Sequence, residues 1–158
     1  MRTTSMLRHL ALVAALGCAG ACAGDDTHGD DTTYNCAVDD RGEAFTANMT
    51  RTGPGGLTFT IVSATPALPI RGDNVWVVDV AQGGSPVTDA AVKLTPFMPD
   101  HRHGSGKVPV WTPDPQTPGR FTVSDINLWM PGVWELTFEA TPTGGVRDSV
   151  LFTFCLTG

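Results

Sequence analysis

The amino-acid sequence predicts an all-β protein, an immunoglobulin-like antiparallel β-sandwich of about seven strands. Apolar and polar residues alternate with a period of two in several runs, and no apolar stripe with helical spacing exceeds two turns. Most of the 18 Gly and 12 Pro lie between these runs, where turns are needed. Hydrophobic residues make up 41% of the chain and charged residues only 16%, which excludes a coiled coil and a disordered acidic chain. A small Greek-key barrel is the alternative fold.

Residues 1–17 predict an export signal. Two arginines precede the apolar run 10–16, which is shorter than the roughly 20 residues that a spanning helix needs. Small residues precede both Cys18 and Cys22, as in bacterial lipoprotein signals, so we expect lipidation at Cys18, with Cys22 as the alternative. An ordinary cleaved signal peptide is the other interpretation. Lipid chains would hold the protein on a membrane surface without spanning it.

The predicted location is therefore the cell envelope, as an exported, membrane-anchored lipoprotein. Ala19 stands after Cys18 in place of the Asp that often retains lipoproteins at the inner membrane, which favours the outer membrane or a periplasm-facing position. Residues 18–35 contain four Asp and no large aliphatic residue, which predicts a flexible acidic tether before a domain at residues 36–158. The net charge of −6 offers no basic face for nucleic acid. The expected partners are the membrane, through the lipid, and an envelope protein.

Six alternating or apolar runs predict the main strands of this domain. They are 57–61, 74–81, 90–95, 119–130, 133–140 and 150–156. In the run 133–140, Trp134, Leu136, Phe138 and Ala140 share one face, and in the run 74–81, Trp76, Val78 and Val80 do so. The run 119–130 changes parity around Ser124 and Asp125, which predicts a β-bulge. The run 150–156 is apolar on both faces, as expected for a covered or central strand.

Two cysteines lie near the ends of the predicted domain. Cys36 opens it and Cys155 nearly closes it, and in an exported protein such a pair indicates a disulfide. Two unpaired thiols are the alternative, which an oxidising compartment disfavours. A thiolate metal site is a weaker alternative, because neither Cys has a neighbouring Cys or His.

A cluster of His and Met residues is the best candidate for a binding site. His101 and His103 would point to the same face of an extended segment, about 7 Å apart at Cα, so both imidazoles could share one metal ion. Met98 precedes them, and Met130 lies in a second segment, each directly before a Pro. Thioether and imidazole ligands suit copper better than magnesium or calcium. The alternative is a solvated loop tip at the two His, with both Met residues filling the core.

Enzymatic functions receive little support from the sequence. No Ser lies in a Gly-x-Ser-x-Gly elbow, and the Gly-rich segment 53–56 lacks the Lys-Ser/Thr of a phosphate-binding loop. We therefore expect that the protein is not an enzyme and has no catalytic residues.

Three segments carry a family resemblance: Met98-Pro-Asp-His101-Arg-His103-Gly104, then Gly119-Arg-Phe121, then Leu128-Trp-Met130-Pro-Gly132-Val-Trp134-Glu-Leu136. In this order they resemble the YtkA-like domain over roughly residues 66–155. The chain departs from the family pattern at Phe121, where Tyr is usual, and at Arg102, where Gly is frequent. Neither departure removes a candidate ligand.

The resemblance implies an immunoglobulin-like sandwich outside the cytoplasm, without enzyme activity. Some members of the family resemble periplasmic copper carriers. Two hypotheses follow. In the first, a lipid-anchored extracytoplasmic domain binds copper through His101, His103 and Met98, with Met130 as a fourth ligand, for storage or delivery. In the second, the domain is a structural or protein-interaction module on the cell envelope that binds no metal.

Overall fold

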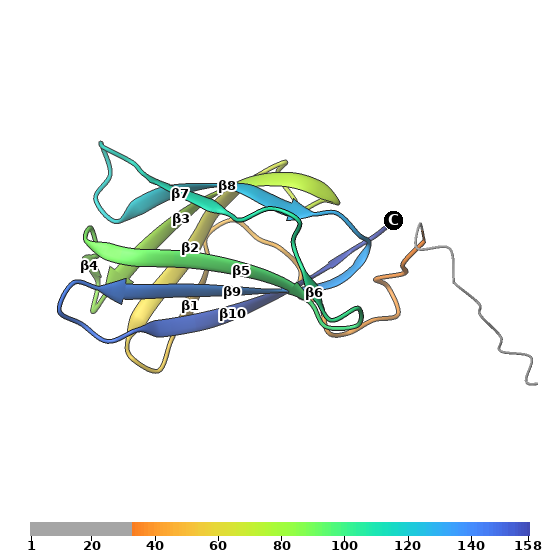
Figure 1. Ribbon diagram of the computed structural model, residues 1–158, viewed down its shortest axis with the longest axis horizontal. Coiled ribbons are helices and arrows are strands. Elements are labelled where there is room, and N and C mark those ends of the chain that lie inside the picture. Colours follow the sequence, from red (N-terminus) through yellow and green to blue (C-terminus); the bar gives the residue numbers. More distant parts are fainter. Residues whose placement is uncertain (1–32) are drawn as a thin grey trace, which may run out of the picture.

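The computed structural model describes residues 33–158, which fold into two facing antiparallel sheets (Figure 1). Its strands are β1 (Met49–Thr52), β2 (Leu57–Thr65), β3 (Gly72–Gln82), β4 (Ser85–Pro86), β5 (Ala90–Met98), β6 (His103–Gly104), β7 (Val110–Pro113), β8 (Arg120–Leu128), β9 (Gly132–Pro142) and β10 (Asp148–Leu156). The expected export signal at residues 1–17 and the two candidate lipidation sites, Cys18 and Cys22, lie outside the described residues. The tether, expected at residues 18–35, lies mostly outside them.

The predicted antiparallel β-sandwich is confirmed. One sheet has the order β1-β2-β3-β8-β7, with β4 paired to β3, and the other has the order β10-β9-β5-β6. The described residues form ten strands rather than about seven. The strands that raise the number are short: β4 and β6 have 2 residues each, and β1 and β7 have 4. Such short segments carry too few residues for an alternating pattern to stand out in the sequence.

The core lies between the sheets and consists of the apolar faces that alternation predicts. Trp76 of β3 and Trp134 of β9 are fully buried, and Trp76 stacks on Phe138 with ring centroids 6.2 Å apart. Phe138 also meets Phe152 of β10 edge-on at 5.3 Å. These aromatic contacts join β3 of one sheet to β9 and β10 of the other, so both sheets share a single core.

The bulge predicted in the run 119–130 is confirmed. For the last strand, which was expected to be covered or central, the central position is wrong. The register between β3 and β8 shifts where Ser124 and Asp125 stand, and Asp125 has a φ of 57°. β10 is an edge strand and not a central one, and Leu151 on its outer face is 43% exposed. Residues 34–45, the N-terminal segment, cover part of this face near the end of the strand, because Cys36 is bonded to Cys155 and Glu43 pairs with Thr153.

A disulfide fixes the N-terminal segment to β10, as the sequence predicts. Cys36 and Cys155 are bonded, with their Cα atoms 5.6 Å apart. Glu43 continues this contact: its backbone N–H donates to the Thr153 carbonyl at 2.8 Å, and its carboxylate accepts from the Thr153 N–H at 2.9 Å. The disulfide is compatible with an extracytoplasmic location. Within residues 33–158, no helix is long and apolar enough to cross a membrane.

At the opposite end of β10, the buried carboxylate of Asp148 holds the turn between β1 and β2. It accepts hydrogen bonds from the backbone N–H groups of Leu57 at 3.0 Å and Ser149 at 2.9 Å. Burial raises the pKa of Asp148, but these amide donors and that of Gly55 lower the pKa by more, so it lies below its usual value. The folded state therefore favours the ionised form.

We expect Asp148→Asn to lower the free energy of unfolding by about 2 kcal/mol at pH 7, because the neutral Asn side chain cannot make the charge-assisted hydrogen bonds of the buried carboxylate. Since the folded pKa lies below the unfolded value of about 3.9, the wild type should lose this advantage as the pH falls below about 4. Urea unfolding between pH 3 and pH 7 measures both effects. The variant should show a flatter pH dependence, whereas the exposed control Asp40→Asn should follow the wild type. Equal pH profiles for Asp148→Asn and the wild type would contradict the prediction.

Candidate functional site

The predicted ligand residues gather at one end of the sandwich, where β5 turns into β6 and β8 continues into β9 (Figure 1). Met98, the last residue of β5, lies directly opposite His103 of β6 in the strand register. Residues 99–102 form the turn between them, and Arg102 adopts a φ of 54°. The prediction that His101 and His103 share an extended segment is therefore wrong, because His101 lies in this turn. A left-handed residue at this position also explains why glycine would suit it.

The two ring nitrogens of His103 have different surroundings. Its Nδ1 lies 3.0 Å from the Gly104 carbonyl oxygen, which only accepts hydrogen bonds, so Nδ1 carries the proton. The other ring nitrogen, Nε2, is buried without any hydrogen-bond partner. Metal-binding histidines commonly donate their second N–H to a backbone carbonyl in this way. Nε2 is therefore held in a fixed direction and makes no hydrogen bond.

Two tryptophans enclose the His103 ring. Trp129 stacks on it with ring centroids 4.9 Å apart and an interplanar angle of 19°, and Trp134 meets it edge-on at 6.0 Å. Trp129 is 44% exposed, so it covers the ring from the solvent side, whereas Trp134 is buried. The indole N–H of Trp134 donates to the Met130 carbonyl at 2.9 Å, which fixes the Met130 backbone beside the same ring system.

Both candidate methionines are buried at this end of the core. Met98 is fully buried and Met130 is 7% exposed. The Met98 methyl group occupies the space that a side chain at position 132 would need, because a Cβ built on Gly132 would overlap it. Gly132 has a φ of +124°, a conformation that favours glycine. The Met-Pro-Gly segment thus packs directly against the Met98 side chain.

His101 differs from the other candidates because it is exposed in the turn. Its ring centroid lies 5.7 Å from that of His103, with an interplanar angle of 51°. The structure therefore brings Met98, His103 and the Met130 segment together and leaves His101 at the rim. Within residues 33–158, no three His, Cys, Asp or Glu side chains are grouped to hold a metal.

A polar network borders the site on the N-terminal side. The Arg41 guanidinium donates to both carboxylate oxygens of Asp100, at 2.7 and 2.8 Å, and its hydrogen bonds hold the Asp100 pKa below its usual value. Arg41 also bonds Asp39 at 2.6 Å and the Tyr34 hydroxyl at 2.9 Å, and that hydroxyl donates to Asp39. The hydrogen bond from Arg41, followed by that from Tyr34, keeps the Asp39 pKa well below its usual range.

Sequence reasoning missed Trp129, Tyr34 and Arg41 as neighbours of the site. Trp129 carries one signal, because it stands between the inward positions Leu128 and Met130 of a run whose other large apolar residues are buried. Tyr34 is the only Tyr of the chain, yet nothing in its sequence neighbourhood points to the Met98 segment.

Comparison with known proteins places these features in one family. The sequence model of the YtkA-like family matches residues 51–139, a range that includes Met98, His101, His103 and Met130 and excludes both disulfide cysteines. Searches of the curated proteins and of the solved structures gave no match. Because the family match covers more than half of the 158-residue chain, the protein belongs to the YtkA-like family.

Proposed function

We propose that this domain binds copper through Met98, His103 and Met130, with His101 at the rim, for storage or delivery outside the cytoplasm. The observation that carries the proposal is the His103 imidazole, whose buried Nε2 has no partner while Nδ1 is committed to the Gly104 carbonyl. A buried polar atom without a partner is costly, and a bound ion would remove that cost. Anchoring through lipid at Cys18, or at Cys22, is part of this proposal.

The donor set indicates which metal the site would take. Thioether sulfur is a soft ligand that selects Cu(I), and imidazole also binds copper well, whereas magnesium and calcium require oxygen. The buried methionines and the stacked Trp129 limit the access of water to His103, which favours the weakly hydrated ion. The function is coordination and exchange of the ion, with no chemical turnover.

His103→Ala should weaken Cu(I) binding by more than about 100-fold, because loss of a partner in the outer shell alone costs about 10- to 100-fold. His101→Ala should cost less than about tenfold, since the exposed imidazole lies at the rim. An anaerobic titration against a chromophoric Cu(I) chelator measures both affinities. Fluorescence of Trp129, the indole stacked on His103, gives an independent signal of metal at this position. Equal binding by wild type and His103→Ala would refute the proposed site.

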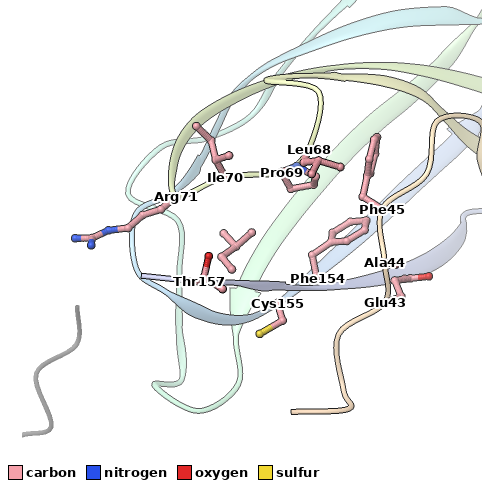
Figure 2. Close-up of a pocket in the computed structure, with 11 residues that line it drawn as sticks. Glu43, Ala44, Phe45, Leu68, Pro69, Ile70, Arg71, Phe154, Cys155 and Thr157 are labelled. Carbon is pink, nitrogen blue, oxygen red and sulfur yellow. The ribbon is translucent and has the colours of Figure 1, made fainter. Parts of the chain in front are cut away.

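A groove beside the end of the sandwich that carries the candidate site favours the second candidate function, a protein-interaction module. It has a volume of about 300 Å³ and lies between the N-terminal segment, the loop before β3 and the end of β10 (Figure 2). Leu68 is 62% exposed and Ile70 is 44% exposed along it. The copper titration separates the two candidates, because an interaction module would bind Cu(I) no better than His103→Ala does.

A further inference from the structure

We propose that residues 34–41 position the Met98 thioether and the 99–102 turn for copper binding; this inference rests on the proposed function. The segment lies outside the family match at residues 51–139. It reaches the site through two different contacts, one apolar and one charged, and the disulfide holds it in place.

The apolar contact is made by the Tyr34 ring. A Cβ built on Gly132 would lie 3.6 Å from Tyr34 Cδ2 and would overlap the Met98 methyl group. The aromatic ring and the thioether side chain thus converge on the same glycine. The Tyr34 ring therefore lies beside the methyl end of the Met98 side chain. Since the thioether end of Met has several rotamers of similar energy, a neighbouring ring restricts which direction the sulfur lone pairs take.

The charged contact is the two-pronged ion pair between Arg41 and Asp100. Asp100 lies in the turn that connects Met98 to the two histidines, and Arg41 holds both of its carboxylate oxygens. A planar guanidinium bound to two oxygens fixes orientation as well as distance. The Tyr34 hydroxyl and Asp39 hold Arg41 in turn, so the ring and the ion pair form one network.

Stability alone is a poor explanation for this network. Arg41 and Asp100 are 45% and 35% exposed, and exposed ion pairs contribute little to folding. The same residues lie next to the turn and the thioether that the copper site needs in fixed positions. The disulfide at Cys36 and the backbone pairing of Glu43 with Thr153 anchor the two ends of the segment on β10. These two attachments hold residues 34–41 in place on β10.

The test compares Tyr34→Ala and Arg41→Gln with conservative variants. Both should raise the Cu(I) dissociation constant about tenfold, the usual effect of losing an outer-shell partner. Tyr34→Phe, which keeps the ring against Gly132, and Arg41→Lys, which keeps the charge, should each recover part of the affinity. Arg120→Gln is the matched control, because Arg120 makes the same two-pronged contact with Asp79, at 2.7 and 2.8 Å, at the other end of β8. Its affinity should stay at the wild-type value.

A metal-free measurement separates this inference from the proposed function. The NMR signal of the Met98 methyl group, in protein labelled at methionine methyl carbons, reports the neighbouring aromatic ring without copper. The chemical shift of this signal should change in Tyr34→Ala and should stay at the wild-type value in Arg120→Gln. Wild-type affinity in both Tyr34→Ala and Arg41→Gln, together with an unmoved Met98 signal, would overturn the inference. If the wild type binds no Cu(I), the proposed function fails, and the Met98 signal alone decides whether Tyr34 positions this side chain.

Discussion

Replacing Cys36 and Cys155 together by Ser is expected to lower the free energy of unfolding by about 5 kcal/mol. The disulfide joins residues 119 positions apart, so it removes a large amount of chain entropy from the unfolded state. It also holds the N-terminal segment on the edge strand β10, where Glu43 pairs with Thr153. Without the bond, the segment is held only by the Glu43–Thr153 pairing and by the partly exposed Arg41–Asp100 network, so it should detach before the sandwich unfolds.

Urea unfolding of the oxidised wild type and the double variant measures the effect, with both cysteines changed so that no free thiol remains. Addition of a dithiol reductant should bring the wild type down to the stability of the variant and leave the variant unchanged. This comparison separates loss of the bond from the effect of two new Ser side chains. A difference of less than about 2 kcal/mol would show that the unfolded chain gains little freedom from the missing bond.

The sequence predicts the core of this fold well because burial imposes a period of two on a strand. Trp76, Val78 and Val80, like Trp134, Leu136 and Phe138, are buried together on the faces that alternation assigns to them. The position of β10 was not predictable in the same way. Its pattern shows which residues avoid water but does not show whether a strand or the N-terminal segment covers them.

In the candidate site, too, the sequence identifies single residues but not the contacts between distant segments. Short motifs identify Met98, His103 and Met130, because each carries its chemistry in its own side chain. The stacking of Trp129 on His103 and the approach of Tyr34 to Gly132 depend on which segments meet in space. These contacts join parts of the chain that are far apart in sequence, so no local pattern encodes them. Copper binding itself stays a prediction.

Gly132→Ala is expected to destabilise the protein by about 3 kcal/mol and to weaken Cu(I) binding at least tenfold. An L-residue at a φ of +124° carries backbone strain of about 1–3 kcal/mol. The new methyl group also enters the space of the Met98 methyl, and overpacking a buried site costs about 1–3 kcal/mol more. Because the Met98 methyl group must move, we expect the thioether beside it to shift as well, which couples the stability loss to the loss of copper affinity.

Gly72→Ala separates backbone strain from this displacement. Gly72 has a φ of +99°, and a Cβ at this position meets nothing within 4 Å. Gly72→Ala should therefore show the effect of backbone strain alone: the free energy of unfolding should fall by about 1–2 kcal/mol, and the Cu(I) affinity should stay at the wild-type value. Urea unfolding and the chelator titration, applied to both variants, give the two numbers that matter. If Gly132→Ala lost no more stability and no more copper affinity than Gly72→Ala, the packing of Met98 against Gly132 would have no part in shaping the site.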